Sequence, residues 1–346
     1  MKEYWDIFVN GYSGYANYLW QEISFQIRPI WHNYFWMLVI VSGFFFALEI
    51  LRPWRKDQPR FRRDFWLDFF YMFFNFFLFS LIIYNASTDV IVNLLNNGIK
   101  AMGGFDLQAA NPMRTWPLWS ILLTGFVVRD FIQWWIHRLL HRSPILWEFH
   151  KVHHSVAEMG FAAHLRYHWM ENVVYRSIEY IPLALLGIGL HDFFLIHIFT
   201  LAWGHYNHAN LRVNGKVTGS IVGSLLTLLI AGTGFELSWA VLLGLTASGG
   251  LLGAFALGPV MKYLFNSPEM HIWHHAYDLP KERHTGVNFG LTLAIWDYIW
   301  KTNYIPHDGR DIKLGFPGVE EYPDQFLSQN IHGFGILPHE KTSQEV

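Results

Sequence analysis

The chain contains no cysteine among its 346 residues. This absence excludes disulfide bonds, thiolate zinc sites, cysteine-ligated iron–sulfur clusters and a cysteine nucleophile. Charged residues are also scarce, at 15%, whereas soluble domains usually carry about 25%. The formal net charge of −2 and the lack of any long basic run give no indication of nucleic-acid binding.

Apolar and aromatic residues take the place of the missing charge and indicate contact with lipid. Hydrophobic residues make up 52% of the chain and aromatic residues 18%. A membrane-spanning helix needs about 20 mostly apolar residues. Three segments meet that standard and are predicted to span the membrane: residues 34–51, residues 65–84 and residues 116–136.

Two further apolar regions predict hairpins. Residues 175–190 and 193–203 are shorter than a full span and predict a hairpin that enters the membrane and returns. Residues 213–257 are rich in Gly, Leu, Ala and Ser, and predict a second membrane hairpin whose small residues permit close helix packing.

The basic residues indicate how the chain is oriented. Residues 52–64 contain six basic and two acidic residues, so the positive-inside rule places this loop in the cytoplasm. The first 33 residues lack a basic region followed by an apolar core, and we expect no cleavable signal peptide. Alternation of the spans then puts the N-terminus outside and the ends of the histidine-rich segments on the cytoplasmic side.

The predicted fold is therefore an all-α, polytopic membrane bundle with a cytoplasmic, histidine-rich metal-binding cap. Residues 1–115 form an N-terminal membrane region with two spans. Residues 116–302 form the histidine-rich domain, which the hairpin at 213–257 interrupts. Residues 303–346 are expected to form a surface tail with little regular structure.

Histidines occur in three tight groups, and imidazole is a ligand suited to zinc, copper, iron and nickel. The groups are one H-x-x-x-H and two copies of H-x-x-H-H, namely His137 and His141; His150, His153 and His154; and His271, His274 and His275. Residues four or three apart share a helix face, while the adjacent histidine of each H-x-x-H-H is expected to serve a neighbouring ion. Eight ligands exceed what one ion uses, so the pattern predicts two metals.

Other residues are weaker candidates. Four further histidines could add ligands: His168, His205, His208 and His284. Asp130 lies seven residues before His137 on the same helix face, and it could orient an imidazole through its second nitrogen or form a simple ion pair. Glu171, three residues after His168, is the second candidate catalytic carboxylate.

These motifs resemble those of the fatty acid hydroxylase and sterol desaturase superfamily. The resemblance lies in D-F-I-Q-W-W-I-H-R-L-L-H at 130–141, H-K-V-H-H at 150–154, N-S-P-E-M-H-I-W-H-H at 266–275 and N-F-G-L-T-L-A-I-W-D-Y-I-W-K-T at 288–302. The chain departs from the superfamily at Gly286, where many members carry aspartate. It also departs in the residues of the 213–257 hairpin, which separate two segments that are normally close together.

The resemblance implies an O2-dependent lipid hydroxylase or desaturase with two histidine-ligated, non-haem iron ions, for which zinc could substitute. It maps the ligands onto the eight clustered histidines and, less directly, onto His168, His284, and His205 or His208. The expected partners are a membrane lipid substrate, the bilayer and a separate electron-donor protein, since no Rossmann glycine pattern or haem attachment motif is present.

Several alternatives stay open at this point. The chain could instead be a metal transporter, or a non-catalytic scaffold that binds lipid and keeps a structural metal. The lipid, and the choice between hydroxylation and desaturation, are not predicted. Without a C-terminal retention signal, a bacterial inner membrane is favoured over the endoplasmic reticulum.

Overall fold

The structure is a computed structural model that describes residues 2–80, 115–185 and 190–335, with isolated positions between 90 and 104. The described residues form helices and two isolated β-bridges, which confirms the predicted all-α fold. The helices are α1 (Lys2–Ile23), α2 (Tyr34–Leu51), α3 (Phe65–Phe73), α5 (Leu118–Arg142), α6 (Pro144–His154), α7 (Trp169–Leu185), α8 (Leu190–His208), α9 (Gly215–Gly234), α10 (Trp239–Ala256), α11 (Met261–Leu264), α12 (Pro268–His274), α13 (Ile295–Ile299) and α14 (Phe326–His332).

Among the described residues, three helices are long and apolar enough to cross a membrane: α2, α9 and α10. They identify a membrane protein, and they match the first predicted span and the predicted hairpin at 213–257. The second predicted span begins with α3 and a π-helical turn, which together form a shorter apolar helix, Phe65–Leu78. Residues 81–84 of that prediction lie outside the described residues.

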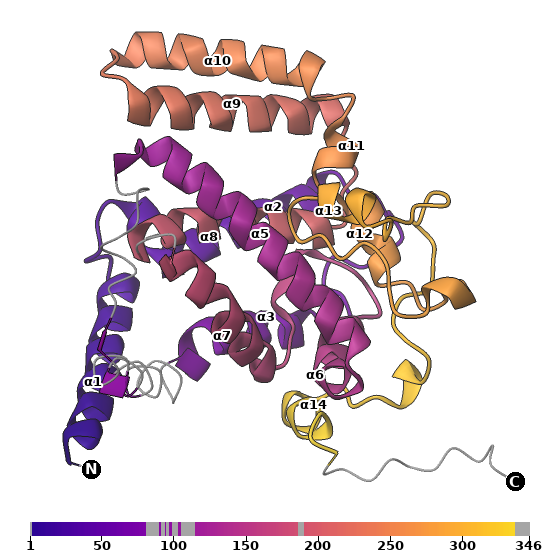
Figure 1. Cartoon of the computed structure of the whole chain (residues 1–346). Coiled ribbons are helices and arrows are strands. Elements are labelled where there is room, and N and C mark those ends of the chain that lie inside the picture. The colour runs from indigo at the N-terminus through magenta and orange to yellow at the C-terminus, as the bar shows by residue number, and fades with distance from the viewer. Residues whose placement is uncertain are drawn as a thin grey trace, which may run out of the picture.

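The third predicted span differs in character from the expectation. Helix α5 is continuous over 25 residues, but it is not among the helices apolar enough to span. Its polar residues Arg129, Asp130 and Gln133 are buried against neighbouring helices. In Figure 1, α5 runs diagonally across the molecule from the hairpin toward α6. Helix α5 therefore contributes buried polar side chains to the interior of the protein.

Helices α7 and α8 occupy the region of the shorter predicted hairpin, and residues 186–189 between them lie outside the described residues. Helix α7 begins before the predicted apolar segment 175–190, and α8 ends after the predicted segment 193–203. Helix α7 starts at Trp169 and α8 continues to His208, so both carry polar residues toward the centre of the protein.

Close packing of small residues joins α9 to α10. A Cβ atom on Gly253 would lie 2.2 Å from the Gly219 carbonyl oxygen, and one on Gly223 would lie 2.3 Å from the Gly249 carbonyl oxygen. Such contacts exist only between glycines, as the sequence predicts for this hairpin. Figure 1 shows the pair at the top of the molecule, outside the other helices, with the start of α9 and the end of α10 near α11.

The C-terminal segment is more than the predicted surface tail. Helix α14 packs against α6, and the Gln329 side chain is fully buried, accepting a hydrogen bond from the Tyr71 hydroxyl at 3.0 Å. Asn330 is also buried and donates to the same hydroxyl at 2.9 Å. The prediction is therefore wrong for α14, while residues 336–346 lie outside the described residues.

The glycine contacts predict opposite effects for two alanine substitutions in α10. Gly253→Ala would push a methyl group into the backbone of α9, and we expect a loss of about 1–3 kcal/mol in the free energy of unfolding. Gly244→Ala is the matched control, because nothing lies within 4 Å of its Cβ position. It should leave stability unchanged or raise it by up to about 1 kcal/mol through helix propensity. Unfolding in detergent measures both, and equal effects would contradict this packing.

Candidate metal centre

Nine buried or half-buried histidines gather in two groups. Within each group, the ligand nitrogens lie within 4.8 Å of one another. They come from α5, α6, α8 and the end of α12. The first group is His137, His141, His150, His154 and His274, and the second is His153, His208, His271 and His275. All eight histidines of the three predicted clusters are present, together with His208.

The two H-x-x-H-H motifs divide between the groups differently from the expectation. In α6, His150 and His154 enter the first group while His153 enters the second. In the second motif, His271 and His275 enter the second group while His274 enters the first. The prediction that residues three apart share an ion is therefore wrong. Residues four apart share a group instead, because they lie about one helical turn apart on the same side of the helix. The histidine between them enters the other group.

The Nε2 atoms within each group are close enough to share an ion. His141, His154 and His274 have Nε2 atoms separated by 3.1–3.3 Å. In the second group, the Nε2 atoms form a chain with separations of 3.0–3.3 Å. Two nitrogens bound at about 2.1 Å to one ion lie roughly 3.0–3.4 Å apart at common bond angles. The observed spacing matches that requirement.

Hydrogen bonds at the other ring nitrogen set the tautomer. A carbonyl oxygen can only accept, so an Nδ1 bonded to one carries the proton and leaves the Nε2 lone pair free. Four Nδ1 atoms donate in this way: His137 to Phe289 at 2.8 Å, His153 to Arg166 at 3.0 Å, His208 to Gly204 at 2.8 Å and His274 to Val287 at 2.8 Å.

Burial keeps these rings neutral. It lowers the pKa of His153 to about 3, so the imidazole is unprotonated at physiological pH, as ligation requires. Several buried lone pairs that point at one another repel and have lost their water, which is costly without a compensating cation. The buried His150 Nε2 has no hydrogen-bond partner among the described residues. The donor set therefore fits metal ions that prefer imidazole.

Two other predicted ligands point elsewhere. His168 has both nitrogens in use, with Nε2 2.9 Å from the Asn330 carbonyl oxygen and Nδ1 accepting from the Met170 N–H at 3.1 Å. His284 is exposed, and its Nδ1 lies 2.9 Å from the Lys281 carbonyl oxygen. Neither belongs to the two groups, because each ring is held by the backbone around it.

His205 also lies beside the centre without joining it. Its Nε2 is 3.0 Å from the Ser42 hydroxyl, and its Nδ1 is 3.1 Å from Nδ1 of His164. Of the pair His205 and His208, which the sequence could not separate, only His208 enters a group.

The two candidate carboxylates have different positions. Asp130 was expected to orient an imidazole, but its carboxylate accepts from the Thr292 and Leu293 backbone N–H groups and from Trp296 Nε1, at 2.9–3.3 Å. It thereby anchors the segment that follows Phe289. The buried Glu171 lies where an orienting carboxylate is needed, with Oε2 2.9 Å from His150 Nδ1.

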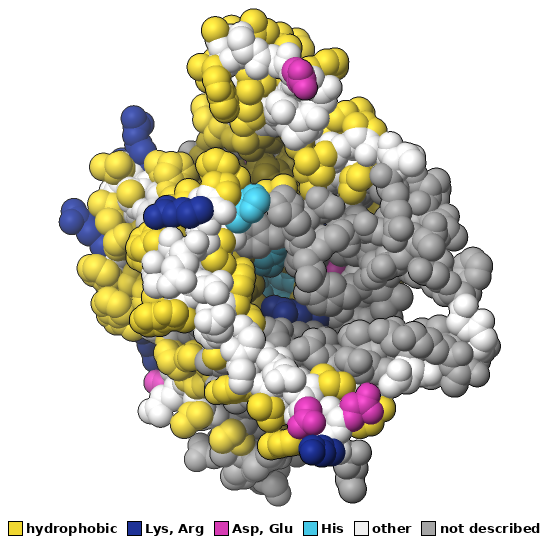
Figure 2. Space-filling view, turned by 90° about the vertical axis from the view of Figure 1, so that its left-hand side faces the viewer, with side chains coloured by type: hydrophobic (Ala, Val, Ile, Leu, Met, Phe, Trp, Pro, Cys, Tyr) yellow, Lys and Arg dark blue, Asp and Glu magenta, His cyan; other side chains and the backbone are white. Residues whose placement is uncertain are grey.

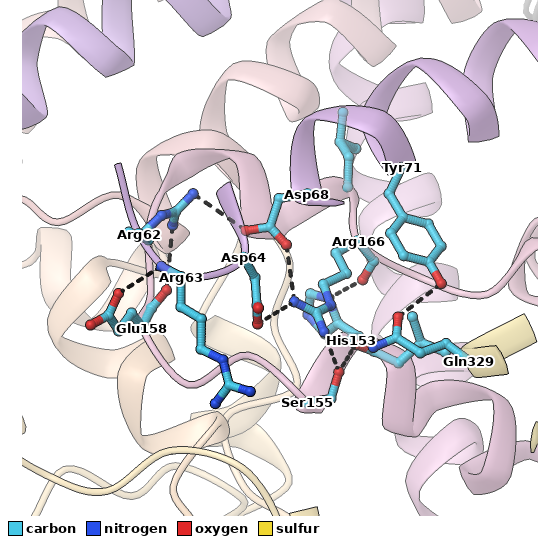
Figure 3. A network of polar contacts seen from close by, with 12 residues as sticks. Arg62, Arg63, Asp64, Asp68, Tyr71, His153, Ser155, Glu158, Arg166 and Gln329 are labelled. Atoms are coloured by element: carbon cyan, nitrogen blue, oxygen red, sulfur yellow. Dashed lines mark hydrogen bonds and ion pairs between the residues drawn. The ribbon is translucent and has the colours of Figure 1, made fainter. Parts of the chain in front are cut away.

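Sequence reasoning missed Arg166, which is hydrogen-bonded to His153 of the second group (Figure 3). Its carbonyl oxygen accepts from His153, while its buried guanidinium contacts Asp64 at 2.8 Å and Asp68 at 3.2 Å. It also donates to the Ser155 hydroxyl at 2.8 Å. This network ties the basic loop at 52–64 to the histidines. Nothing in the local sequence marks Arg166, since its two carboxylate partners lie about a hundred positions away.

Gly286 has a local explanation in the structure. Its φ is +99°, a conformation that favours glycine. A Cβ atom there would lie 2.9 Å from His141 Nδ1 and 3.0 Å from the Phe289 ring. A side chain at this position would press on a histidine of the first group, so glycine fits this site where many superfamily members carry aspartate.

A cavity of about 650 Å³ opens onto both groups. From the two groups, its lining includes His137 and His150 of the first and His153, His208 and His271 of the second. Figure 2 shows a hollow in the surface with histidine and basic side chains inside it. The histidine centre is thus accessible to a molecule of moderate size.

Comparison with known proteins agrees with this geometry. The fatty acid hydroxylase family model matches residues 122–225, a region that holds six of the nine histidines. Ornithine lipid hydroxylase OlsE from Rhizobium tropici is 25% identical over 219 residues, covering 63% of this chain and 52% of the relative. These matches support the resemblance to the fatty acid hydroxylase and sterol desaturase superfamily that the histidine motifs predict.

A second relative matches a shorter region. The very-long-chain aldehyde decarbonylase GL1-10 from Oryza sativa subsp. japonica is 40% identical over 75 residues, covering 21% of this chain and 25% of the relative. The chain thus spans about half the length of the hydroxylase and a quarter of the decarbonylase. No solved structure matches the chain.

The Arg166 network predicts a large loss of stability when its cation is removed. Arg166→Met removes the ion pair of the half-buried Asp64 and leaves the buried Asp68 with Arg62 alone, 3.4 Å away, and we expect the free energy of unfolding to fall by about 3 kcal/mol. Arg310→Met is the control, since its ion pair with Asp311 is exposed and should contribute less than about 1 kcal/mol. Guanidinium unfolding in detergent measures both variants. Equal, small losses would show that the buried pair does not support the fold.

Proposed function

We propose that this protein is a membrane oxidoreductase that inserts oxygen from O2 into an unactivated C–H bond of a lipid. The observation that carries the proposal is the pair of histidine groups, with Nε2 atoms 3.0–3.3 Å apart, opening onto one cavity. Hydroxylation balances as one C–H bond, one O2, two electrons and two protons giving one alcohol and one water. The hydroxylase relative favours this outcome over desaturation.

Two iron ions bound by these histidines would supply the O2 activation that C–H cleavage requires and that side-chain acids and bases cannot provide. The protein's own contribution is positional. The carbonyl acceptors fix the ring tautomers, Glu171 orients His150, and Arg166 holds His153 in place. The cavity walls bind the lipid and keep bulk water from the reacting carbon. The two electrons are assigned to a separate donor protein.

The same contacts support an orientation in the membrane. The basic loop at 52–64 lies against the histidine centre, since Arg166 contacts Asp64 and Gln58 donates to the Met159 carbonyl oxygen at 2.8 Å. A loop with six basic residues favours the cytoplasm. We therefore propose a multi-pass protein whose metal centre faces the cytoplasm, and the bacterial hydroxylase relative favours a bacterial inner membrane.

Oxygen labelling tests the proposed reaction. Membranes from a bacterial host that expresses the protein should incorporate one atom of ¹⁸O from ¹⁸O2 into a lipid, detected by mass spectrometry. His274→Ala removes a histidine of the first group whose Nε2 lies 3.1–3.3 Å from those of His141 and His154. We expect at least about a 100-fold loss of label. Label that enters from H2¹⁸O instead of ¹⁸O2, or persists in the variant, would contradict the proposal.

Metal content tests the division into two groups. His274→Ala and His271→Ala should each lose metal from one group and retain it in the other, since each side chain belongs to a different group. His284→Ala is the control, because this exposed ring lies outside both groups and its loss should leave the metal content unchanged. Elemental analysis of purified variants makes the comparison. Loss of all metal in His284→Ala would overturn the assignment.

A further inference from the structure

The histidine centre comes close to the protein surface at His141, away from the cavity. Of the nine histidines, eight are buried and His141 is half-buried. His141 is not part of the described lining of the cavity, which includes Tyr15 and Tyr18 of α1. Figure 1 shows α1 at the left edge of the molecule and α6 and α12 in its right half. The cavity and the half-buried edge of His141 thus offer two separate approaches to the centre.

Trp147 of α6 lies beside this edge of His141. Its side chain is also half-buried, and the centroids of the two rings are 5.1 Å apart. The Trp147 ring lies 5.2 Å from that of His154 and 6.0 Å from that of His150. One partly exposed side chain therefore contacts three histidines of the first group, and it connects the surface with the candidate ligands.

Two arginines flank His141 at the end of α5. Arg138 and Arg142 are about one helical turn apart on the same side of the helix, with Arg138 half-buried and Arg142 exposed. The acidic residue nearby on α6, Glu148, is paired with Lys151 at 2.6 Å. The surface at the end of α5 therefore keeps an excess of positive charge.

The short helical turn Lys281–Arg283 adds a further cation. The segment that follows it lies against His141, since a Cβ atom on Gly286 would be 2.9 Å from His141 Nδ1. The turn is folded back close to Gly286, whose N–H donates to the Arg283 carbonyl oxygen at 2.9 Å. Lys281 and Glu282 are both exposed, and Arg283 is half-buried. Basic residues therefore outnumber acidic ones on this side of His141 as well.

We propose that this surface is the docking site of an acidic, one-electron carrier protein that reduces the metal centre. The name His141 face is used here for the surface that the following residues form: Arg138, His141, Arg142, Trp147 and Lys281. Interfaces for electron transfer are small, and opposite charges steer the encounter of the two proteins. The His141 face matches such a partner, because it places positive charge around a half-buried aromatic ring that contacts the histidines.

The docking site completes the electron balance of the proposed reaction. Each carrier gives up one electron and is oxidised, so two successive dockings supply the two electrons that one hydroxylation consumes, while the two protons come from water. A carrier on the His141 face leaves the cavity open to the lipid. This inference rests on the proposed function, whose separate electron donor it describes by its charge and places on the surface.

Binding of a plant-type 2Fe–2S ferredoxin, an acidic one-electron carrier, tests the docking site. Cytochrome c, a basic one-electron carrier of similar size, is the matched probe of opposite charge. Surface plasmon resonance measures both on the full-length, metal-loaded protein in nanodiscs of zwitterionic phosphatidylcholine. We expect the dissociation constant of ferredoxin to be at least about 10-fold lower than that of cytochrome c, and to rise with ionic strength because the charges are exposed.

Charge reversal locates the binding. Arg142→Glu combined with Lys281→Glu should raise the dissociation constant of ferredoxin by at least about 10-fold at low ionic strength. The same variant should slow reduction of the metal centre by reduced ferredoxin, but not by dithionite, which is small and needs no docking site. Lys2→Glu combined with Lys216→Glu is the control, because it makes the same change of net charge at exposed positions of α1 and α9, away from α6 in Figure 1.

The outcomes separate this inference from the proposed function. Equal affinity for the two carriers, or unchanged ferredoxin binding in the Arg142 and Lys281 variant, overturns the docking site even when dithionite-reduced protein oxidises a lipid. Binding to vesicles of anionic lipid that this variant loses, without ferredoxin binding, also overturns it and assigns the basic residues to the membrane surface.

The proposed function fails on different observations, namely the absence of bound metal or of O2-derived oxygen in any lipid after reduction by dithionite. Preference for ferredoxin that is lost in the charge-reversed His141 face alone supports the docking site. The comparison of the two carriers on the parent protein stands even where a variant fails to fold.

Discussion

The structure depends on hydrogen bonds that run from ring Nδ1 atoms of histidines to backbone carbonyl oxygens. Each one commits the proton to Nδ1 and turns the Nε2 lone pair toward the centre of its group, as at His137 and His274. The carbonyls come from Val287 and Phe289, in the segment that Asp130 and Asp297 anchor through backbone N–H groups. The fold therefore positions the candidate metal centre through its backbone, and buried carboxylates outside the two histidine groups fix the direction of the candidate ligands.

The same principle explains why so many charges are buried in a protein with few of them. Arg166, Asp64 and Asp68 form a closed network beneath His153, and Arg129 with Glu179 joins α5 to α7 beside the cavity. Buried ion pairs of this kind contribute little net stability, but removal of one partner is severe because the other charge stays buried. In this chain they hold helices in register around the histidines, while the apolar helices α2, α9 and α10 provide the contact with lipid.

Sequence reasoning located the eight clustered histidines because helical spacing is a local property, and the structure brings all eight together. It also identified α2 and the small-residue hairpin, whose apolar character is visible over a single segment. Side chains whose role depends on distant partners were not accessible in this way. Asp130 shares a helix face with His137 but bonds to residues 292–296, and Arg166 has partners about a hundred positions away. Helix α14 was missed because its polar sequence is buried by specific hydrogen bonds to Tyr71 rather than by hydrophobicity.

The central claim is that two histidine groups of five and four side chains each surround one metal ion. X-ray absorption at the iron edge of the reconstituted protein measures this directly, because imidazole rings give a characteristic scattering pattern. The account predicts a nitrogen-dominated shell with an average of between four and five imidazoles per iron at about 2.1 Å, consistent with the Nε2 separations. An average of one or two imidazoles per iron, with oxygen ligands making up the remainder, would contradict it.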